Sequence, residues 1–318
     1  MFIYVAKRLG YIAAILVAMS LLVFLVTHAL PENTAGVILG EYATPETRAA
    51  LEHKLGLDLP ISVQYLRWSA GFLHGDFGQS VILEQPITPI LWPALGRSAL
   101  IAIPTLLLVS IVGIGIGVAA AVRHGRAFDR VATISTYVAV SVPEFFWGLV
   151  FILVFSSYFK WLPTSGAASP GDGLWPMLSH LVLPVATLTF GLQAHVSRMT
   201  RSSILEALRS NYVRAARARG VAERIVILRH ALRNAMLPTI TVLAQDLGFL
   251  VGGIVAVETV FAYPGVGRLL VYSISRHDLP LMEAVILVVT AIYCIANLAA
   301  DLLYGWFNPR IRYGQSLD

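Results

Sequence analysis

The chain has 318 residues, of which 57% are hydrophobic and only 13% are charged, with a formal net charge of +5. Soluble domains carry about 25% charged residues, so this composition excludes an ordinary soluble protein and indicates a membrane protein. The positive charge alone is also compatible with nucleic-acid binding, but no basic domain with a fold of its own is present.

Six apolar stretches are long enough to cross the membrane as helices, which takes about 20 residues each. They cover residues 9–30, 98–122, 131–159, 174–196, 235–257 and 281–304. Lys7 and Arg8 precede the first stretch, as they would in a signal peptide, but its apolar length exceeds the roughly 7–15 residues of a signal core. We therefore predict an all-α polytopic fold that retains its first helix and has both termini on one side.

The segment between the first two spans, residues 31–97, is predicted to form a small extracytoplasmic helical cap. Thr44 and Pro45 are typical of the N-cap and first position of a helix, predicted over 45–55. A second helix is predicted over 63–74, followed by a turn at 75–78. The chain then divides into the tail and first span (1–30), the cap (31–97) and a membrane core (98–318).

Lysine and arginine are distributed unequally between the two sides. With the N-terminus inside, sixteen fall in inner segments and six in outer segments, and Arg97 lies at a boundary. Because positive residues are enriched on the cytoplasmic side, both termini are predicted to be cytoplasmic.

The inner segment 198–237, between the fourth and fifth spans, is rich in arginine and alanine. A short helix is predicted over 212–220, stopped by Gly220, and a second over 221–234. Leu237 and Pro238 are predicted to mark the entry to the next span. Two helices meeting at a glycine would form a rigid projection, although a solvated basic loop would also satisfy the charge rule.

Four acidic residues fall within predicted spans, and a charge at mid-bilayer costs roughly 2.5–3.5 kcal/mol. Glu144 follows Pro143, which is expected to kink the third span, and Asp246 lies beside Gln245 in the fifth. A polar translocation path and hydrogen bonding between helices explain Glu144, Gln245 and Asp246 equally well. Glu283 and Asp301 lie near span ends, and structural roles are expected for them.

Small residues recur within two spans, at Gly113, Gly115 and Gly117 and at Gly248 and Gly252, and predict close helix packing. His180 and His195 flank one span and are expected to be structural. The chain has no phosphate-binding loop of the Gly-x-x-x-x-Gly-Lys-Ser/Thr type, so it has no nucleotide site of that kind of its own.

Several motifs together resemble one family. They are YVRAARARG (212–220), RHALRNAMLP (229–238), LGLDLP (55–60), GDFGQS (75–80), VETVFAYPGVG (257–267) and NPRIRY (308–313). The chain resembles ABC importer permeases of the dipeptide/oligopeptide/nickel branch over essentially its whole length. Arg214 stands where the wider superfamily has glutamate, and Asn308 replaces a usual acid. The spacing from Gly220 to Pro238 is longer than the general pattern, as in the peptide branch.

The resemblance implies a type I importer fold, a bacterial inner-membrane location and several partners. These are a second homologous permease, two ATPase subunits, an extracytoplasmic substrate-binding protein and the lipid bilayer, with no nucleic acid. ATP and magnesium would be bound by the ATPase partners, and this chain would hold no cofactor and no metal. The expected mechanism is alternating access, in which ATP binding by the partners opens the pore outward.

The same resemblance implies that part of the inner segment docks into a groove of the ATPase. The expected docking residues are Arg214, Ala215, Ala216, Arg217, Ala218, Arg219, Gly220, Val221, Ala222 and Glu223. Gly220 would permit a sharp turn, and the small alanines would allow close approach. A stiff segment can transmit motion to the spans, whereas a loose loop cannot.

Two other classes of protein compete with this interpretation. An ion-coupled secondary transporter would need functional acids in repeated broken helices, and no repeat is visible. An intramembrane hydrolase would need a nucleophile and base within the spans, and no convincing pair is present. Di- and oligopeptides are the expected substrates, with nickel chelates, glutathione, opines and oligosaccharides as alternatives.

Overall fold

The structure, a computed structural model, describes residues 2–29, 44, 58–169 and 171–307. It forms two units, Met1–Arg97 with Gly265–Ile295 and Ser98–Pro264 with Ala296–Asp318. Two long helices, α5 (Thr88–Val122) and α13 (Leu279–Phe307), belong partly to each unit. Each unit is described below by itself.

The predicted six-span helical fold is confirmed, with one span broken. Within the described residues, five helices are long and apolar enough to cross a membrane, and a sharply bent pair makes a sixth crossing if counted as one. All six predicted spans fall on helices of this set. The helices extend beyond the predicted limits because helical hydrogen bonding continues past the apolar stretch that lipid requires.

The first unit contains α1 (Phe2–Ala29), α4 (Ile61–Leu73) and α12 (Val266–Ser275). The Phe24 ring of α1 lies 5.4 Å from Tyr65 and 5.6 Å from Trp68, both on α4. The Thr27 hydroxyl donates to Glu283 at the start of α13 over 2.5 Å. The expected structural role of Glu283 is therefore met by a contact that ties α1 to α13.

Helix α4 confirms the predicted helix at 63–74, although it begins two residues earlier, directly after Pro60. The predicted helix at 45–55 lies outside the described residues. The prolines and glycines of residues 261–280 predict a loop between the fifth and sixth spans, but residues 266–275 form α12. That loop prediction was wrong because Pro264 and Gly265 precede the helix and Pro280 follows it, whereas Gly267 is accommodated within its first turn.

The turn at 75–78 is confirmed. Gly75 and Gly78 have φ angles of +79° and +77°, and the Gly78 amide donates to Asp76 Oδ1 over 3.0 Å. A short antiparallel pair follows, β1 (Gln79–Ser80) with β2 (Gln85–Pro86). Asp278, buried just before α13, accepts hydrogen bonds from the Ser80 hydroxyl and from the amides of Val81 and Ile82.

Helix α5 begins at Thr88, ten residues before the predicted span. The residues after Thr88 include Pro89, which is tolerated in the first helical turn because its missing amide proton would have no partner there. The end of the predicted cap is therefore the first part of a long helix. The apolar pattern located the membrane-crossing part of this helix and missed its first ten residues, because Pro93 and Arg97 interrupt the apolar run.

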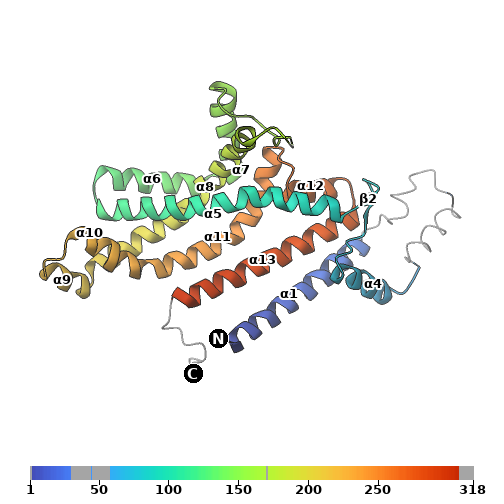
Figure 1. Cartoon of the computed structure of the whole chain (residues 1–318), viewed down its shortest axis with the longest axis horizontal. Helices are drawn as coiled ribbons and strands as arrows, with labels where there is room; N and C mark the ends of the chain where they lie inside the picture. The colour runs from blue at the N-terminus through green and yellow to red at the C-terminus, as the bar shows by residue number, and fades with distance from the viewer. Residues whose placement is uncertain (1, 30–43, 45–57, 170, 308–318) are drawn as a thin grey trace. The chain divides into compact units, whose positions relative to one another are not determined.

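The second unit is a bundle of α5, α6 (Ala127–Ser141), α8 (Leu174–Arg209) and α11 (Leu232–Val260), which run alongside one another (Figure 1). Its core contains Leu188, Leu192, Val196, Leu250 and Val257. Helix packing is close at two of the predicted glycines. A methyl group on Gly113 would lie 2.8 Å from Val196 Cβ, and one on Gly117 would lie 2.6 Å from Thr200 Cβ.

The same prediction was wrong for Gly115 and Gly252, which face open space. Spacing alone does not reveal which face of a helix meets a neighbour, because that depends on how the whole bundle is arranged. Gly253, which the sequence did not single out, is the crowded glycine of α11.

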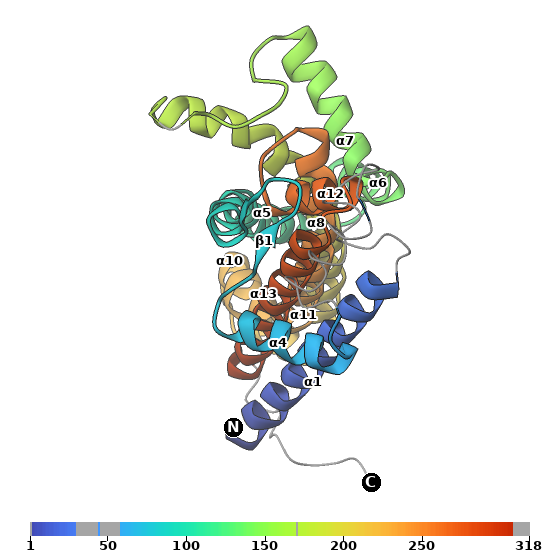
Figure 2. The same cartoon turned by 90° about the vertical axis from the view of Figure 1, so that its right-hand side faces the viewer.

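The third predicted span is two helical segments that meet at 106°. After α6 the chain turns at Val142 and Pro143 into α7 (Glu144–Phe151) and the π-helix η1 (Ile152–Tyr158). Val142 is extended, with φ −114° and ψ 133°, because a residue before proline is disfavoured in the helical region. The predicted kink at Pro143 is thus a full elbow. Residues 144–158, here called the side arm, leave the direction of α6 and project to one side (Figure 2), with α7 packed against α8 and α11.

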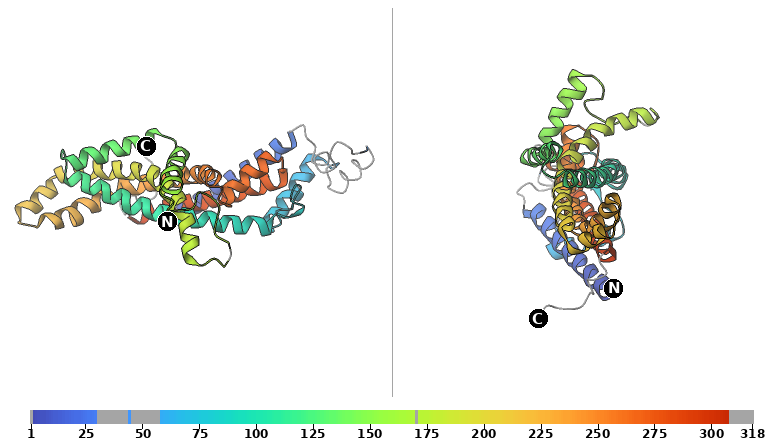
Figure 3. Two further views of the ribbon diagram at one scale, coloured as in Figure 1. Left: turned by 90° about the horizontal axis from the view of Figure 1, so that it is seen from above. Right: turned by 90° about the vertical axis from the view of Figure 1, so that its left-hand side faces the viewer.

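The polar end of the bundle is built from α8, α9 (Asn211–Ala218), α10 (Glu223–Ile225) and the π-helix η2 (Val226–Ala231). Figure 3 shows α9 and α10 beyond the far end of the bundle helices. The predicted first short helix is confirmed as α9. The prediction of a separate second helix over 221–234 was wrong, since α10 and η2 run into α11, and Pro238 lies inside that helix.

Candidate coupling segment and buried polar cluster

The segment 198–237, here called the coupling segment, has a small hydrophobic core of its own. Val213 and Ala216 of α9 and Val226 of η2 are fully buried against one another, with Leu208 and Val221 packed around them. Ser210 is extended and separates α9 from the end of α8. A solvated basic loop would have no such core, so the structure favours the rigid alternative.

The outer surface of α9 is positively charged, and most of its other side chains are small. Arg214, Arg217 and Arg219 are exposed, and so are Ala215 and Ala218 between them. Arg217 donates to both oxygens of Glu223, at 2.5 and 3.0 Å, and this contact raises the pKa of the guanidinium. The pair crosses the turn between α9 and α10, although an exposed ion pair adds only about 0–1 kcal/mol.

Nine of the ten predicted docking residues are exposed or half-buried on this surface, and Ala216 is buried beneath it. The surface therefore combines flexible cations at its edges with a flat centre of alanine side chains. Such a surface can approach a partner closely, because alanine loses no side-chain entropy on contact.

Gly220 ends α9 with a φ of +76°, a conformation that side chains rarely adopt. A Cβ there would meet nothing within 4 Å, so any cost of substitution comes from the backbone alone. We expect Gly220→Val to destabilise the coupling segment by about 1–2 kcal/mol and to lower transport several-fold. Gly220→Asn should be closer to wild type because asparagine tolerates left-handed backbone. Thermal unfolding and uptake assays on both variants would check this, and equal effects would contradict it.

A cluster of polar side chains lies inside the bundle, where α7, α8 and α11 meet. Asp246 of α11 is 1% exposed, and His195 of α8 donates from Nδ1 to Asp246 Oδ1 over 3.0 Å. The second oxygen, Oδ2, is buried with no hydrogen-bond partner among the described residues. Glu144 is close enough to both residues to interact with them electrostatically.

Glu144 is the first residue of α7, directly after the elbow. Its carboxylate lies against Gly253, where an added methyl group would overlap Oε2. A methyl group on Gly191 would lie 3.1 Å from Glu144 Cγ. The two glycines thus make room for the side chain between α8 and α11, at the start of the side arm.

The structure brings two of the three predicted path residues together and separates the third. Glu144 and Asp246 belong to the cluster, whereas Gln245 is exposed on another face of α11. That face, here called the α11 stripe, also contains Thr241, Phe249 and Gly252 at helical spacing. The His195 ring lies 5.7 Å from that of Phe249, so it connects the buried aspartate with the stripe.

The composition of the α11 stripe differs from that of other exposed helix faces. The exposed residues of α6 include Val131, Ile134 and Val138, which suit contact with lipid. Besides Phe249, the α11 stripe carries a threonine, a glutamine and a glycine, and small or polar residues of this kind are enriched where membrane helices meet a partner. A face of this kind is expected to meet water, substrate or a protein partner.

Two residues of functional interest were missed by the sequence interpretation. His195 was expected to be structural, and no short-range motif connects it with Asp246. Glu258 is fully buried in α11 and accepts a hydrogen bond from Ser98 over 2.5 Å. The predicted span ended at Val257, so Glu258 was not counted among the buried acids, although its place in an apolar run was a usable signal.

Comparison with known families and proteins gives consistent results. A family model described as "Binding-protein-dependent transport system inner membrane component" matches residues 113–313, and the model of its N-terminal part matches residues 1–112. The chain is 36% identical to the probable peptide ABC transporter permease protein y4tP of Sinorhizobium fredii, covering 98% of this chain and 99% of the relative.

Two further relatives and one solved structure are also similar to this chain. The dipeptide transport system permease protein DppB of Alkalihalophilus pseudofirmus is 35% identical, covering 98% of this chain and 100% of the relative. The glutathione transport system permease protein GsiC of Escherichia coli is 38% identical, covering 98% and 99%. The crystal structure of an amino acid ABC transporter with histidines matches with a TM-score of 0.51 at 17% identity, covering 70% of this chain and 95% of that one, which supports the fold alone.

Proposed function

The chain belongs to the family of binding-protein-dependent transport system inner membrane components, and we propose on that basis that it conducts di- and oligopeptides by alternating access. As a member of this family it is a permease subunit of an ABC importer and not an enzyme. The main prediction from the sequence is confirmed over the ion-coupled alternative. Such an importer works with an ATPase and a substrate-binding protein.

The chain is an inner-membrane component. Both termini are proposed to be cytoplasmic, because that orientation places sixteen lysines and arginines inside and six outside. The coupling segment then faces the cytoplasm, and the cap formed by α4 and the β1–β2 pair faces outward. The cap and the segment after Tyr263 are the proposed contact surfaces for the binding protein.

The single observation that carries the mechanism is the rigidity of the coupling segment. Residues 214–223 are the proposed docking surface for the ATPase. Two ATPase subunits are proposed, and these would bind ATP and magnesium. Because η2 continues into α11 without a break, a displacement of this surface would move α11 as a rigid body. The α11 stripe would then change its exposure to the two sides of the membrane.

A second permease of similar fold is proposed to complete the pore. The α11 stripe is the proposed lining of the path, with Gln245 exposed on it and Asp246 and Glu144 behind it. In this arrangement the two acids support the lining through His195 and the side arm. Polar groups inside a membrane are costly, and a water-filled path is one environment that satisfies them.

Peptides are proposed as substrates because two of the similar proteins are named peptide and dipeptide permeases. Glutathione, the substrate in the name of a third relative, is itself a tripeptide. The shared chemistry is a short backbone with charged ends. Nickel chelates and oligosaccharides are the alternatives from the sequence, and the binding protein is expected to select among them.

The proposal is tested in proteoliposomes that contain this chain, its second permease, the ATPase and the binding protein. Uptake of a radiolabelled dipeptide should require ATP and the binding protein and should be stopped by vanadate. A protonophore should have no effect. Uptake that follows a proton gradient without ATP would contradict the mechanism, and uptake of a nickel chelate or oligosaccharide in preference to peptides would contradict the substrate.

A further inference from the structure

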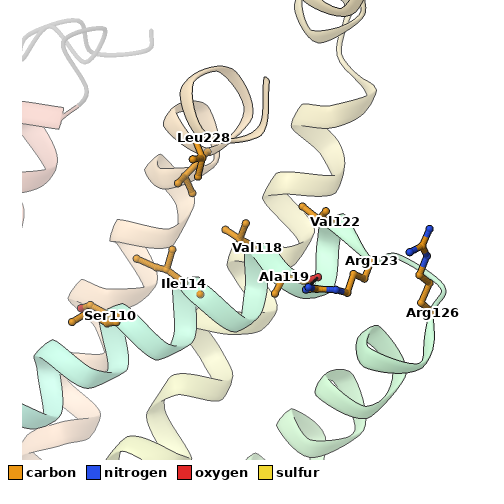
Figure 4. A pocket seen from close by; sticks show the side chains of 11 residues that line it. Ser110, Ile114, Val118, Ala119, Val122, Arg123, Arg126 and Leu228 are labelled. Carbon is orange, nitrogen blue, oxygen red and sulfur yellow. Dashed lines mark hydrogen bonds between the residues drawn. The ribbon is translucent and has the colours of Figure 1, made fainter. Parts of the chain in front are cut away.

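A groove of about 800 Å³ lies on the surface of the bundle between the second half of α5 and the junction of η2 with α11 (Figure 4). Its wall on α5 includes Ile111, Ile114 and Val118. Leu228 and Leu232 form the facing wall, and Figure 4 shows Leu228 directed toward α5. The volume is within the range of about 300–1,000 Å³ that is typical of ligand sites.

The groove is apolar along its length and open at Gly115. Ile111 is 68% exposed and Leu228 is 51% exposed, so the described part of the chain leaves these side chains uncovered. A Cβ on Gly115 would meet nothing within 4 Å. The groove is therefore shaped for a flexible apolar chain that lies parallel to α5.

Two arginines form the end of the groove. Arg123 and Arg126 follow the last residues of α5, and both are exposed. The nearest acid in sequence, Asp129, is already bound by Arg201 at 2.5 and 2.9 Å. Within the described residues, neither Arg123 nor Arg126 has a carboxylate partner, so the end of the groove keeps its positive charge.

We propose that this groove binds an anionic phospholipid, with an acyl chain along α5 and the phosphate at Arg123 and Arg126. The inference rests on the proposed orientation, which places the arginines at the cytoplasmic leaflet. That leaflet has a negative surface potential, and basic pockets between helices on that side bind anionic headgroups. The charge at one end and the apolar length beyond it match the two parts of such a lipid.

The groove lies beside the junction between the coupling segment and α11, so a lipid bound there would affect how motion passes from one to the other. Leu228 belongs to η2, which joins the coupling segment to α11. A chain lying between α5 and η2 would brace this junction against the bundle. Anionic lipid is therefore expected to increase the uptake driven by each ATP hydrolysed.

For the test, the complete transporter is reconstituted in nanodiscs. Native mass spectrometry then measures which lipid stays bound to the released transporter. Phosphatidylglycerol and phosphatidylcholine are compared as probes. We expect retention of phosphatidylglycerol in preference to phosphatidylcholine. Removing each arginine should weaken retention about five-fold, so Arg123→Gln with Arg126→Gln should weaken it more than ten-fold. The matched control is Arg130→Gln, an exposed arginine that does not line the groove.

A second pair of variants tests the apolar part without touching the charge. Gly115→Phe should fill the groove and abolish retention of phosphatidylglycerol. Gly252→Phe is its control, because Gly252 is another open glycine in a spanning helix and lies outside the groove. Equal retention of both lipids, or equal loss from Gly115→Phe and Gly252→Phe, would overturn the proposal.

Cross-linking distinguishes a lipid from a protein in the groove. A cysteine at Ser110, at the end of the groove opposite the two arginines, should not be captured by the second permease. Capture of that subunit would show that a protein covers the groove and would overturn the proposal. Retained phosphatidylglycerol in a transporter that ignores ATP would support the lipid site while contradicting the proposed function, so the two failures are separable.

Discussion

Replacing Ala218 with tryptophan should abolish ATP-driven uptake while leaving the chain folded in the membrane. Ala218 is exposed at the end of α9, outside the small core of Val213, Ala216 and Val226. Forcing a large side chain into a closely packed contact costs about 1–3 kcal/mol, and about 1.4 kcal/mol is a factor of ten in affinity. We expect the ATPase to co-purify at least about ten-fold less well, and uptake to fall with it.

The matched control is Ser202→Trp, which adds the same side chain at an exposed position of α8 in the coupling segment. It lies outside the docking residues and should retain the ATPase. Thermal unfolding of both variants should resemble that of wild type. Normal co-purification of Ala218→Trp with the ATPase would show that residues 214–223 are not the docking surface.

The first short helix of the coupling segment, α9, was predictable because its signals are local. Arginine and alanine favour a helix, and a glycine with nothing on its Cβ side ends it. The continuation of η2 into α11 was not predictable in the same way. Pro238 is a strong signal for a break, but inside a membrane helix neighbouring helices can satisfy the freed carbonyl group.

At the elbow between α6 and α7, the sequence predicted the position of the bend but not its angle. Val142 and Pro143 predicted a local irregularity, and the structure has one at that position. The angle of 106° depends on what the side arm packs against after the turn. Those contacts come from α8 and α11, which lie far away in sequence, so the period and composition of residues 131–159 indicated only one span.

The polar cluster was only partly predictable for the same reason. A buried acid is visible in the sequence because its cost in the membrane is large. Its partner is not visible, since His195 and Asp246 are 51 residues apart and meet only when α8 packs on α11. The glycines that make room for Glu144 also belong to two helices, and neither has a spacing that distinguishes it.

Replacing Gly253 with alanine should reduce uptake by about ten-fold or more. The added methyl group would overlap the carboxylate of Glu144 and lie 2.9 Å from Leu188 Cδ2. Overpacking of this kind costs about 1–3 kcal/mol, and the smallest adjustment is to move Glu144 out from between α8 and α11. Because Glu144 is the first residue after the elbow, that movement would also displace the side arm.

Gly252→Ala is the matched control, since the neighbouring glycine faces open space in the same helix. Thermal unfolding should be close to wild type for this variant. The double variant Gly253→Ala with Glu144→Ala isolates the contact, because the next nearest side chain among the described residues is the flexible end of Leu188. We expect a coupling energy of about 0.5–3 kcal/mol between the two positions, the range for residues in contact.

Additive effects of the two substitutions would mean that the carboxylate does not lie against Gly253. Equal behaviour of Gly253→Ala and Gly252→Ala would lead to the same conclusion. If instead Glu144→Ala restores stability to the Gly253→Ala variant without restoring uptake, the carboxylate has a role beyond filling space. That role would be to fix the angle of the side arm relative to α8 and α11. In the double variant, the methyl group of the new alanine at position 253 can fill the space of the carboxylate but cannot interact with His195.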